Sequence, residues 1–549
     1  MAIVYLIGTG PGDPGLMTVR GLQCLESADV VLYDHLVPAR LLRSARPDAE
    51  RIDVGVAAPQ PQEQEAICYL LAEKAREGKT VARLKWGDPF VFDHGGSEAL
   101  FLHEQGIRFE VVPGVPAGVA VPSYAGIPIT YPGGGGTEAL FLHEQGLRFE
   151  VVPGVPAGVA VPSYAGIPIT YPGGGDTLTF IRGHADEGKT RASIDWASLA
   201  RLDGAIVCYA GPQQLPHILS ALVSHGRPPE DTAAVIYDGT LPTQDTIVGS
   251  LDEITETISR SNDRRAAILV VGRVVKLREH LRWFDARPLF GKRVLVTRPK
   301  EQAMDLVDRL EAMGAQAIEA PTIRIIPPED YGPLDEACAR AGEFDWIIFS
   351  SPTAVDAFLD RLLAGPQDLR ALQGVKLCVV GPATAERLAR RGLKVDLTPS
   401  EYRAEAVVRA MAETTNVTGL NVLLPHADIG REIIADELRK QGADVTEVIA
   451  YRTTVVEPER EGEPDIYRML LERRIDVVTF TSASAVRHFV RVLGAEPAAD
   501  LLRTTTVASI GPVTAEAATQ CNIQTTIMPS SYTIPALVEA IVEYFGKQP

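Results

Sequence analysis

Short runs of Val, Ile and Leu alternate along the chain with stretches in which apolar residues recur at helical spacing. In the first half, the runs IVYLIG and DVVLYD flank the amphipathic stretch TVRGLQCLESA, and the runs TVARLKW and RFEVVPG follow. A second series begins near Thr177 with TLTFIRGH and ends near Leu281. Alternation of this kind predicts a parallel α/β architecture.

The chain is too long for a single hydrophobic core. Its 549 residues, at about 150 residues per domain, suggest three or four folding units. The segment RWFDARPLFGKR leads from the second series into a new strand, VLVTRP, so we place the main boundary near Gly291. We expect a first domain at 1–285 with subdomains 1–175 and 176–285, a linker at 286–291, and a second domain at 292–549.

The first half contains a nearly identical tandem repeat. Residues 97–135 and 137–175 match at 37 of 39 positions and differ only at Ser97/Thr137 and Ile107/Leu147. This identity indicates a recent duplication or an error of sequence assembly. Because a single-copy domain has room for one set of elements, we expect one copy to dock and the other to be extruded. Copy one directly continues PFVFDHGG, which slightly favours it as the docked copy.

The second half contains a diverged repeat with a period of about 130 residues. The segment DWIIFSSPTAVDAF mirrors DVVTFTSASAVRHF, VVGPATAE mirrors SIGPVTAE, and PSEYRAEAVV mirrors PSSYTIPALV. Two similar α/β lobes follow, and the space between them is the default ligand site. We expect lobe one at 292–326 plus 454–549 and lobe two at 327–453.

Charge and cysteine content narrow the class of protein. The formal net charge of -18 and the absence of a Lys/Arg run argue against nucleic acid as a partner. The six cysteines are far apart and form no CxxC pair, so we expect reduced core residues and no metal site. The N-terminal MAIVYLIGTG has no basic leader, and prolines interrupt the uncharged run Val111 to Gly136. We therefore expect a cytoplasmic protein without a membrane partner.

A glycine-rich loop, Gly8-Thr9-Gly10-Pro11-Gly12-Asp13, follows the first predicted strand, and Asp34 ends the second. The spacing imitates a dinucleotide fingerprint, but Asp13 stands where Gly or Ala is needed and would repel a pyrophosphate. A loop that admits a ligand without phosphates fits better, and a purely structural turn remains an alternative.

Residues 1 to about 281 resemble the uroporphyrinogen-III C-methyltransferases through LIGTGPGDPGLMTVRGL, ADVVLYDHLV, VARLKWGDPFVF, VVPGVPAGVAVPSYAGIPIT, IVCYAG and DGTLPTQ. The resemblance implies a fold of two α/β subdomains that binds S-adenosylmethionine as methyl donor and forms a homodimer. The implied cofactor-binding residues are Pro11, Gly87, Asp88, Val91, Pro116, Ala117, Tyr209, Ala210 and Gly239. If copy two docks, Pro156 and Ala157 replace Pro116 and Ala117.

Methyl transfer to a pyrrole carbon needs an aligned donor and a base for the released proton. The resemblance implies that Asp34 is this base, although an Asp at a strand end is also a common cap. Several positions depart from the family pattern: Val56 replaces a proposed proton-donor Lys, Trp86 a Gly, Pro116 a Thr, Ala210 a Met, and Tyr131-Pro132 the usual His-Arg. Trp86 would narrow the pocket or stack on a ligand, unless it is simply a buried aromatic.

Residues 292–549 resemble uroporphyrinogen-III synthase through VLVTRP, DWIIFSSPTAV, VVGPATAERL, ADVTEVIAYRT and DVVTFTSASAV. The resemblance implies a two-lobed α/β fold that dehydrates and cyclises hydroxymethylbilane without a cofactor. It also implies that Tyr451 is the catalytic acid, whereas a Tyr packed at a strand end is the structural alternative.

The tetrapyrrole substrate carries eight carboxylates, which an acidic protein must bind locally. Predicted strand-to-helix turns suit carboxylates because free amides and the positive end of the helix dipole lie there. Candidate substrate-binding residues are Arg298, Ser351, His426, Arg431, Thr481 and Ser482. Each Ser or Thr can equally cap its own helix.

These observations favour a bifunctional enzyme that makes uroporphyrinogen III and methylates it twice to precorrin-2, on the way to siroheme or cobalamin. One alternative is a synthase whose methyltransferase-like half only binds ligand, because Val56 cannot donate a proton. A second alternative is a nicotinamide-dependent dehydrogenase, against which Asp13 argues.

Overall fold

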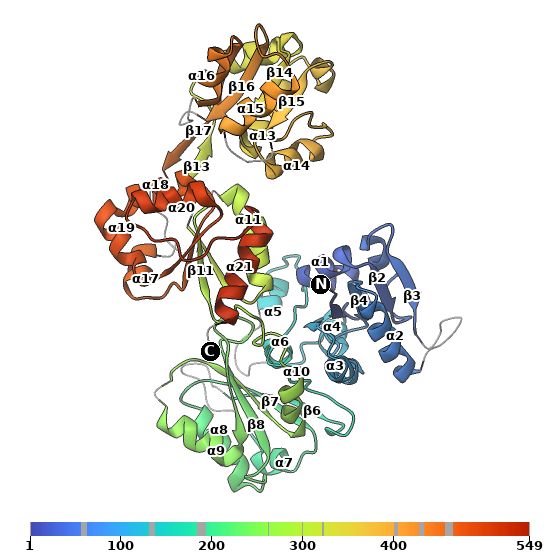
Figure 1. The fold of residues 1–549 in the computed structure, drawn as a ribbon. Helices are drawn as coiled ribbons and strands as arrows, with labels where there is room; N and C mark the ends of the chain where they lie inside the picture. Colours follow the sequence, from blue (N-terminus) through green and yellow to red (C-terminus); the bar gives the residue numbers. More distant parts are fainter. Residues whose placement is uncertain are drawn as a thin grey trace. The chain divides into compact units, whose positions relative to one another are not determined.

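The computed structural model describes residues 2–55, 63–130, 138–183, 194–261, 263–298, 300–320, 323–399, 404–427, 433–455 and 465–547. The chain divides into two compact units (Figure 1). Unit 1 comprises Met1–Gly291 with Met313–Gln316, and unit 2 comprises Lys292–Ala312 with Ala317–Pro549. The first sheet of unit 1 and the sheets of unit 2 are mainly parallel, and helices join the strands in both units, which confirms the α/β fold class.

The first sheet of unit 1 is entirely parallel and has the order β3-β2-β4-β1-β5. Its strands are β1 (Val4–Gly8), β2 (Val30–Tyr33), β3 (Glu50–Asp53), β4 (Val81–Lys85) and β5 (Phe109–Val112), and the first three helices are α1 (Val19–Ser27), α2 (Gln64–Arg76) and α3 (Gly95–Glu104). Thr18 begins α1 because its hydroxyl accepts a hydrogen bond from the Gly21 N–H at 3.1 Å. The carboxyl ends of these strands form one edge, where ligands of parallel sheets bind.

The second sheet of unit 1 is mixed and has the order β6-β7-β10-β8-β9. Its strands are β6 (Leu178–Arg182), β7 (Ala205–Ala210), β8 (Thr232–Tyr237), β9 (Asp245–Ser250) and β10 (Ala267–Val271), and its helices are α7 (Trp196–Ala200), α8 (Leu215–Ser224), α9 (Leu251–Arg260) and α10 (Arg278–Leu281). Strands β6 and β7 are parallel, and the other pairs are antiparallel. A capping box of Ser250 and Glu253 fixes the start of α9.

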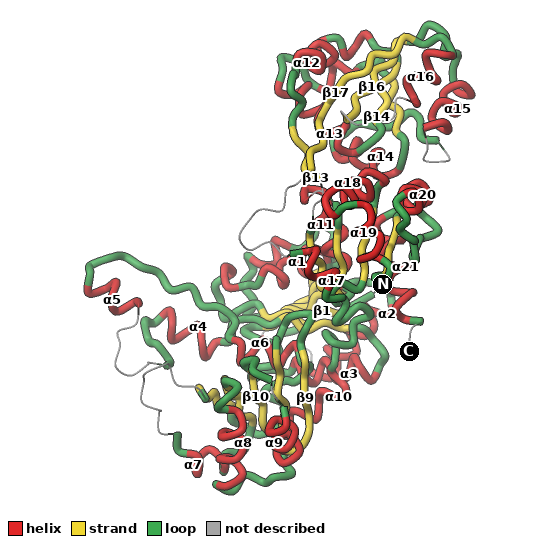
Figure 2. Tube along the Cα trace, turned by 90° about the vertical axis from the view of Figure 1, so that its left-hand side faces the viewer, coloured by secondary structure: helices red, strands yellow, loops and turns green. Residues whose placement is uncertain are grey.

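The tandem repeat docks as a hybrid, which corrects the expectation that copy one docks as a whole. Copy one supplies most of α3 and all of β5, whereas copy two supplies α6 (Ala157–Tyr164), which packs in the core with β10. The excursion between them includes α4 (Ala117–Tyr124) and α5 (Glu138–Glu144), whose outer end is drawn in Figure 2. Along the chain, α3 closely follows β4 and α6 closely precedes β6. The hybrid arises because each docked helix is thus the one that is joined directly to its strand. The surplus 40 residues therefore leave the fold between them, where a long surface loop costs little.

Unit 2 contains two sheets that share one strand order. The first, β12-β11-β18-β19, corresponds strand for strand to β17-β16-β14-β15 of the second, which β13 extends. The strands are β11 (Arg293–Val296), β12 (Gln316–Glu319), β13 (Ile323–Ile326), β14 (Trp346–Phe349), β15 (Lys376–Val379), β16 (Asn421–Ala427), β17 (Asp444–Val455), β18 (Val477–Phe480) and β19 (Thr506–Ser509). The sequence repeat therefore has a structural counterpart.

The helices of unit 2 follow the same correspondence. They are α11 (Lys300–Ala312), α12 (Gly332–Ala339), α13 (Pro352–Ala364), α14 (Pro382–Arg390), α15 (Ala404–Thr414), α16 (Ile433–Lys440), α17 (Ile466–Leu471), α18 (Ala483–Leu493), α19 (Ala495–Leu502), α20 (Pro512–Gln520) and α21 (Ile534–Gly546). Helices α13 and α18 begin alike, because Ser351 and Ser482 each accept a backbone N–H three residues on at 3.1 Å. The two sheets are linked by β13 and β17, which pair antiparallel.

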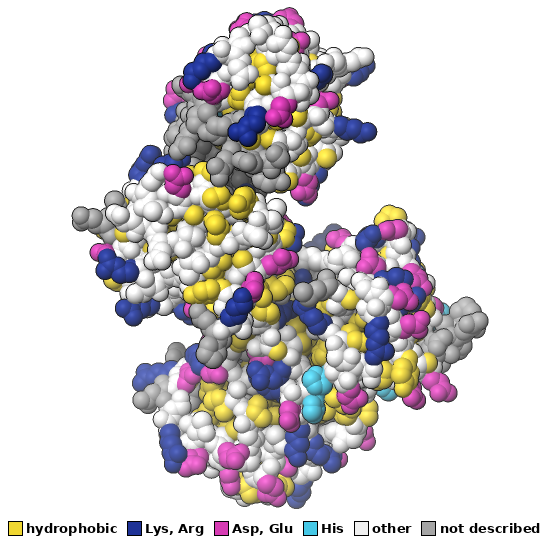
Figure 3. All heavy atoms as spheres, in the orientation of Figure 1, with side chains coloured by type: hydrophobic (Ala, Val, Ile, Leu, Met, Phe, Trp, Pro, Cys, Tyr) yellow, Lys and Arg dark blue, Asp and Glu magenta, His cyan; other side chains and the backbone are white. Residues whose placement is uncertain are grey.

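Charged side chains of both signs lie at the surface (Figure 3), and the cysteines lie mostly in the core. Acidic and basic side chains are interspersed on the face shown in Figure 3. Five of the six cysteines are buried, and Cys521 is half-buried. Within the described ranges, no helix is long and apolar enough to span a bilayer, and no cluster of three metal-ligating side chains is present.

Candidate active sites

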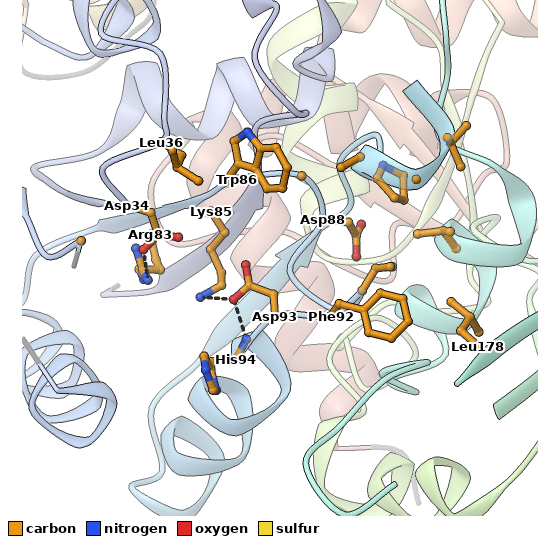
Figure 4. A pocket seen from close by; sticks show the side chains of 18 of the residues that line it. Asp34, Leu36, Arg83, Lys85, Trp86, Asp88, Phe92, Asp93, His94 and Leu178 are labelled. Carbon is orange, nitrogen blue, oxygen red and sulfur yellow. Dashed lines mark hydrogen bonds and ion pairs between the residues drawn. The ribbon is translucent and has the colours of Figure 1, made fainter. Parts of the chain in front are cut away.

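A pocket of about 750 Å³ lies at the carboxyl edge of the first sheet of unit 1. Residues that follow β2, β4 and β5 line it, and Val159, Leu178 and Phe180 complete the wall (Figure 4). This volume falls in the range of small-molecule sites. The pocket is therefore the candidate ligand site of unit 1.

Three glycines let the backbone segments at this edge approach one another closely. A Cβ on Gly114 would lie 2.2 Å from the Gly87 carbonyl oxygen, and a Cβ on Gly8 would lie 2.5 Å from the Gly114 nitrogen. Gly10 and Gly87 exchange backbone hydrogen bonds of 3.2 and 2.9 Å. Only glycine fits this crossing, which joins the first loop to the turn after β4.

Asp13 stabilises the first loop from outside the pocket. Its carboxylate accepts hydrogen bonds from the Gly15 N–H at 2.8 Å and from the Tyr124 hydroxyl at 2.6 Å. These hydrogen bonds, with that from Tyr124 first, lower the pKa of Asp13. Asp13, which argues against a pyrophosphate in this loop, is thus a capping residue.

Asp88 is buried beneath the glycine crossing. Its two carboxyl oxygens accept backbone N–H groups of Phe90 at 2.8 Å and of Gly114 at 2.9 Å. Burial raises its pKa to about 7, although both hydrogen bonds oppose this rise. Asp88 lines the pocket and also ties together the segments that follow β4 and β5.

We expect Asp88 to make the stability of unit 1 fall with rising pH. Its pKa of about 7 in the folded chain lies above the usual aspartate value of 3.8, so its contribution to stability is complete below pH 3.8 and is lost as pH rises through 7. The free energy of unfolding falls by about 1.4 kcal/mol per pH unit until the pH reaches the folded pKa, so between pH 5 and pH 8 it falls by about 3 kcal/mol. Urea unfolding of the full chain should show this slope in the wild type and a smaller slope in Asp88→Asn; equal slopes would contradict the assignment.

A buried network of charges forms the polar wall of the pocket (Figure 4). Arg83 contacts Asp34 at 2.5 Å and Glu98 at 3.2 Å, and Lys85 contacts Glu98 at 2.9 Å and Asp93 at 2.8 Å. Burial by itself would raise the pKa of Glu98, but Arg83 and Lys85 hold it at about 2. The network fixes the Asp34 carboxylate at the pocket while leaving it partly accessible to solvent.

Apolar side chains form a further part of the lining, the apolar wall: Leu36, Val91, Phe92, Val159, Leu178 and Phe180. Figure 4 shows Phe92 and Leu178 on the side away from Asp34, Leu36 beside Asp34, and Trp86 between Leu36 and Asp88. Phe92 has a φ of 51°, which is strained for an aromatic residue, and its N–H donates to the Thr170 hydroxyl at 2.6 Å. Trp86 lines the pocket and is half-buried, so it is not a fully buried aromatic.

The pocket gathers only part of the predicted cofactor set. Asp34, Gly87, Asp88, Val91, Pro116 and Ala117 line it, whereas Pro11, Tyr209, Ala210 and Gly239 do not. Tyr209 accepts the Gly158 N–H at 2.9 Å, and Gly239 packs so closely on Val161 that a Cβ would lie 2.4 Å away. Val56, Tyr131 and Pro132 fall outside the described residues.

Sequence reasoning missed Arg83, Lys85 and Glu98. The available signal was the pair of basic residues at alternate positions of VARLK, which places both side chains on one face of an otherwise apolar strand. All five residues of β4 are buried. Basic residues in such a strand require buried carboxylates as partners.

In unit 2 the structure brings two predicted residues together. The hydroxyls of Tyr451 on β17 and Ser351 at the start of α13 lie 3.2 Å apart. His426 bonds to the Ala427 carbonyl at 2.6 Å, and its other ring nitrogen lies 3.8 Å from Glu447. The Tyr451–Ser351 pair is therefore the best-defined polar contact among the candidates.

The remaining candidates of unit 2 are distributed over other turns. Ser482 caps α18, and Thr481 is the half-buried residue before it. Arg298 follows β11, and burial lowers its pKa, although Asp305 opposes this shift. Arg431 falls outside the described residues. Ser351 and Ser482 each cap their own helix in the structure.

The fold and the pocket define a two-part α/β enzyme with a small-molecule site at the carboxyl edge of a parallel sheet. The model of the "Tetrapyrrole (Corrin/Porphyrin) Methylases" matches residues 3–137 and 131–255, and that of "Uroporphyrinogen-III synthase HemD" matches residues 304–539. The two methylase matches overlap at the junction of the tandem copies.

Curated relatives match both parts. "Porphyrin biosynthesis protein HemD" of Ruminiclostridium josui is 34% identical over 99% of this chain and 98% of its own length. "Uroporphyrinogen-III C-methyltransferase" of Bacillus subtilis is 34% identical over 76% of this chain and 77% of its own length. "S-adenosyl-L-methionine-dependent uroporphyrinogen III methyltransferase" of Methanosarcina barkeri is 37% identical over 51% of this chain and 94% of its own length.

The chain therefore belongs to the family in which a tetrapyrrole methylase is fused to a uroporphyrinogen-III synthase. It is an enzyme of tetrapyrrole biosynthesis with a uroporphyrinogen-III C-methyltransferase domain and a uroporphyrinogen-III synthase domain.

Proposed function

We propose that unit 2 converts hydroxymethylbilane to uroporphyrinogen III with inversion of the last pyrrole ring. Unit 1 then transfers two methyl groups from S-adenosylmethionine to this product and yields precorrin-2. The observation that carries the proposal is the coexistence of both families in one chain, with Asp34 held at the pocket by buried Arg83. The enzyme acts in the cytoplasm, with small tetrapyrroles as its partners and unit 1 as its dimerisation domain.

The pocket of unit 1 suits S-adenosylmethionine, which supplies an electrophilic methyl group when bound. The carboxylates of Asp34 and Asp93 lie on the polar wall and favour a positively charged ligand, and the apolar wall accommodates uncharged surface. Gly87 at the glycine crossing brings backbone close to the site. Pro116 and Ala117 would complete the contacts from the segment after β5.

Asp34 accepts a proton that the tetrapyrrole releases after methylation. Every pyrrole carbon of uroporphyrinogen III bears a side chain or a bridging methylene, so this proton leaves a ring nitrogen or a bridging carbon and not the methylated carbon. S-adenosylmethionine would supply the methyl group and would leave as S-adenosylhomocysteine. The Asp34 carboxylate then takes the proton and can release it to water, because its side chain is 26% exposed. Arg83 holds Asp34 in place, and the buried wall excludes water from the reacting atoms.

In unit 2 the Tyr451 hydroxyl donates a proton to the leaving hydroxyl of hydroxymethylbilane. The carbon–oxygen bond breaks, water leaves, and the resulting cation is attacked by a pyrrole carbon to close the ring. The attacked terminal pyrrole loses a proton as its aromaticity is restored, and this proton regenerates the Tyr451 hydroxyl. Ser351 orients the Tyr451 hydroxyl at 3.2 Å. Arg298, His426, Arg431, Thr481 and Ser482 would bind the carboxylates of the substrate.

Each half-reaction can be tested separately in the full chain. Hydroxymethylbilane alone should give uroporphyrinogen III, and uroporphyrinogen III with methyl-labelled S-adenosylmethionine should take up two labelled methyl groups. Formation of uroporphyrinogen I at the uncatalysed rate would contradict the first assignment, and unlabelled uroporphyrinogen III would contradict the second.

The observation that Trp86, which stands where the family pattern has Gly, lines the pocket favours a second candidate. In this alternative unit 1 binds ligand without turnover, and unit 2 supplies the only activity. Isothermal titration of the full chain with S-adenosylmethionine, combined with the labelling assay, separates the two candidates. Binding without label transfer would establish the alternative.

We expect Tyr451→Phe to slow cyclisation about tenfold. The effect stays below the roughly 10²–10⁴-fold typical of general acids, because Tyr451 is only half-buried and water can substitute for it. The measurement is the rate of uroporphyrinogen III formation, with Tyr467→Phe, an exposed tyrosine of α17, as control. An unchanged rate in Tyr451→Phe would remove this residue from the mechanism.

A further inference from the structure

The surface of unit 1 that holds α6 is a well-defined docking surface for residues 157–170. Val159, Val161, Ile167 and Ile169 pack there with Ile236 and Val270. Polar contacts fix the register: the Tyr209 hydroxyl accepts the Gly158 N–H at 2.9 Å, and the Trp283 indole donates to the Ser163 carbonyl at 3.0 Å. We call this surface the α6 seat.

The chain carries a second segment that fits the same seat. Residues 113–135 are identical in sequence to residues 153–175, because both differences between the copies lie outside this part. The side chains that are buried in one copy are exposed in the other: Val161 is 7% exposed and Val121 55%, and Ile167 is 0% exposed and Ile127 58%. The exposed apolar side chains of residues 117–130 therefore repeat those that fill the seat.

The exposed segment already has the backbone conformation that the seat requires. Pro116 and Pro156 precede α4 and α6 with φ, ψ of −64°, 146° and −66°, 146°. Both helices have eight residues, and Gly126 and Gly166 follow them with φ of 72° and 71°. Docking of the second segment would require no refolding of the helix.

The two arrangements have similar chain-entropy costs. With α6 in the seat, the connection that precedes it is longer than a single copy needs by 40 residues (117–156), and with α4 in the seat, the connection that follows it is longer by the same number (136–175). Since loop-closure entropy depends on length, it cancels between them. The observed arrangement gains the contacts that α4 makes outside the seat, chiefly the Tyr124–Asp13 hydrogen bond and the packing of Ala120 with Leu16.

We propose that residues 117–130 are an alternative occupant of the α6 seat and that the two segments exchange in it. The seat then tolerates damage to either segment, because the intact one replaces the damaged one. This redundancy is a property of unit 1 that does not depend on which reaction its pocket catalyses. It follows from population shift between two arrangements of nearly equal energy.

Aspartate substitutions at equivalent positions test the exchange in the full chain. Val161→Asp places a charge in the seat of the docked segment, and Val121→Asp places the same charge on the exposed one. Both single variants should unfold thermally close to the wild type, whereas the double variant should unfold roughly 10 °C lower or more. A Val161→Asp midpoint as low as that of the double variant would overturn the proposal.

Deletion of residues 117–156 provides the matched background. Joining Pro116 to Ala157 leaves a single copy with an intact α6, and this shortened chain should fold. It has no replacement segment, so Val161→Asp should lower its thermal midpoint by as much as the double substitution lowers that of the full chain. If Val161→Asp lowers the thermal midpoint equally in the full and the shortened chains, the exchange is contradicted.

A thiol probe reports the exchange directly. Ile127→Cys should react quickly with a thiol reagent in an otherwise unchanged chain, because residue 127 is exposed there. Adding Val161→Asp should protect this thiol as residues 117–130 enter the seat, with the parent chain correcting for Cys521. Continued fast labelling in the double variant would overturn the proposal even if its thermal midpoint were unchanged.

Discussion

Asp34→Asn is expected to lower the rate of methyl transfer about 10²–10⁴-fold, the usual range for loss of a general base. The amide cannot accept the pyrrole proton at neutral pH, but it can still accept the hydrogen bond from Arg83 that holds the carboxylate now. The measurement is the single-turnover rate with labelled S-adenosylmethionine and uroporphyrinogen III.

The matched control is Asp53→Asn. Asp53 ends β3, the strand next to β2, but it does not line the pocket. Its carboxylate accepts the Gly55 N–H at 3.0 Å and contacts His35 at 3.5 Å. A rate loss confined to Asp34→Asn, with unchanged affinity for S-adenosylhomocysteine, supports the assignment; equal losses in both variants, or none in Asp34→Asn, would refute it.

Arg83→Met is expected to destabilise unit 1 by about 3–5 kcal/mol, the usual cost of removing one partner from a buried ion pair. Arg83 is 1% exposed, and its loss leaves Asp34 without its cation and Glu98 with Lys85 alone. The measurement is the free energy of urea unfolding of the full chain at pH 7. Arg76→Met, at the exposed end of α2, is the control and should change stability little.

The difference between the wild type and Arg83→Met should shrink in acid. Arg83 is one of the two cations that hold the pKa of Glu98 at about 2, below the usual glutamate value of 4.5. This contribution is present above pH 4.5 and is lost as pH falls towards 2. A difference that stays constant from pH 7 to pH 3 would show that Arg83 acts only through packing.

The sequence was sufficient for the fold class and for much of the pocket, because strand runs and glycine loops are local features. It could not decide how the tandem copies dock. Val121 and Val161 have identical neighbours, yet one is exposed and the other buried. The difference in burial depends on contacts with distant parts of the fold, such as the Tyr124–Asp13 hydrogen bond of the exposed copy, and no local pattern encodes such contacts.

The buried charges were also beyond local reasoning. Lys85 and Arg83 occur in a strand whose other residues are apolar, and their partner Glu98 lies on α3. In unit 2, the sequence shows Ser351 and Ser482 at equivalent helix starts. A serine hydroxyl there can cap the helix or bind substrate, so the sequence alone could not decide between these two roles.

The most direct test of the account is incubation of the full chain with hydroxymethylbilane and S-adenosylmethionine, followed by absorbance and mass analysis of the product. The account predicts a tetrapyrrole of the precorrin-2 mass that carries two methyl groups from the donor. Accumulation of unmethylated uroporphyrinogen III, with S-adenosylmethionine unconsumed, would contradict it.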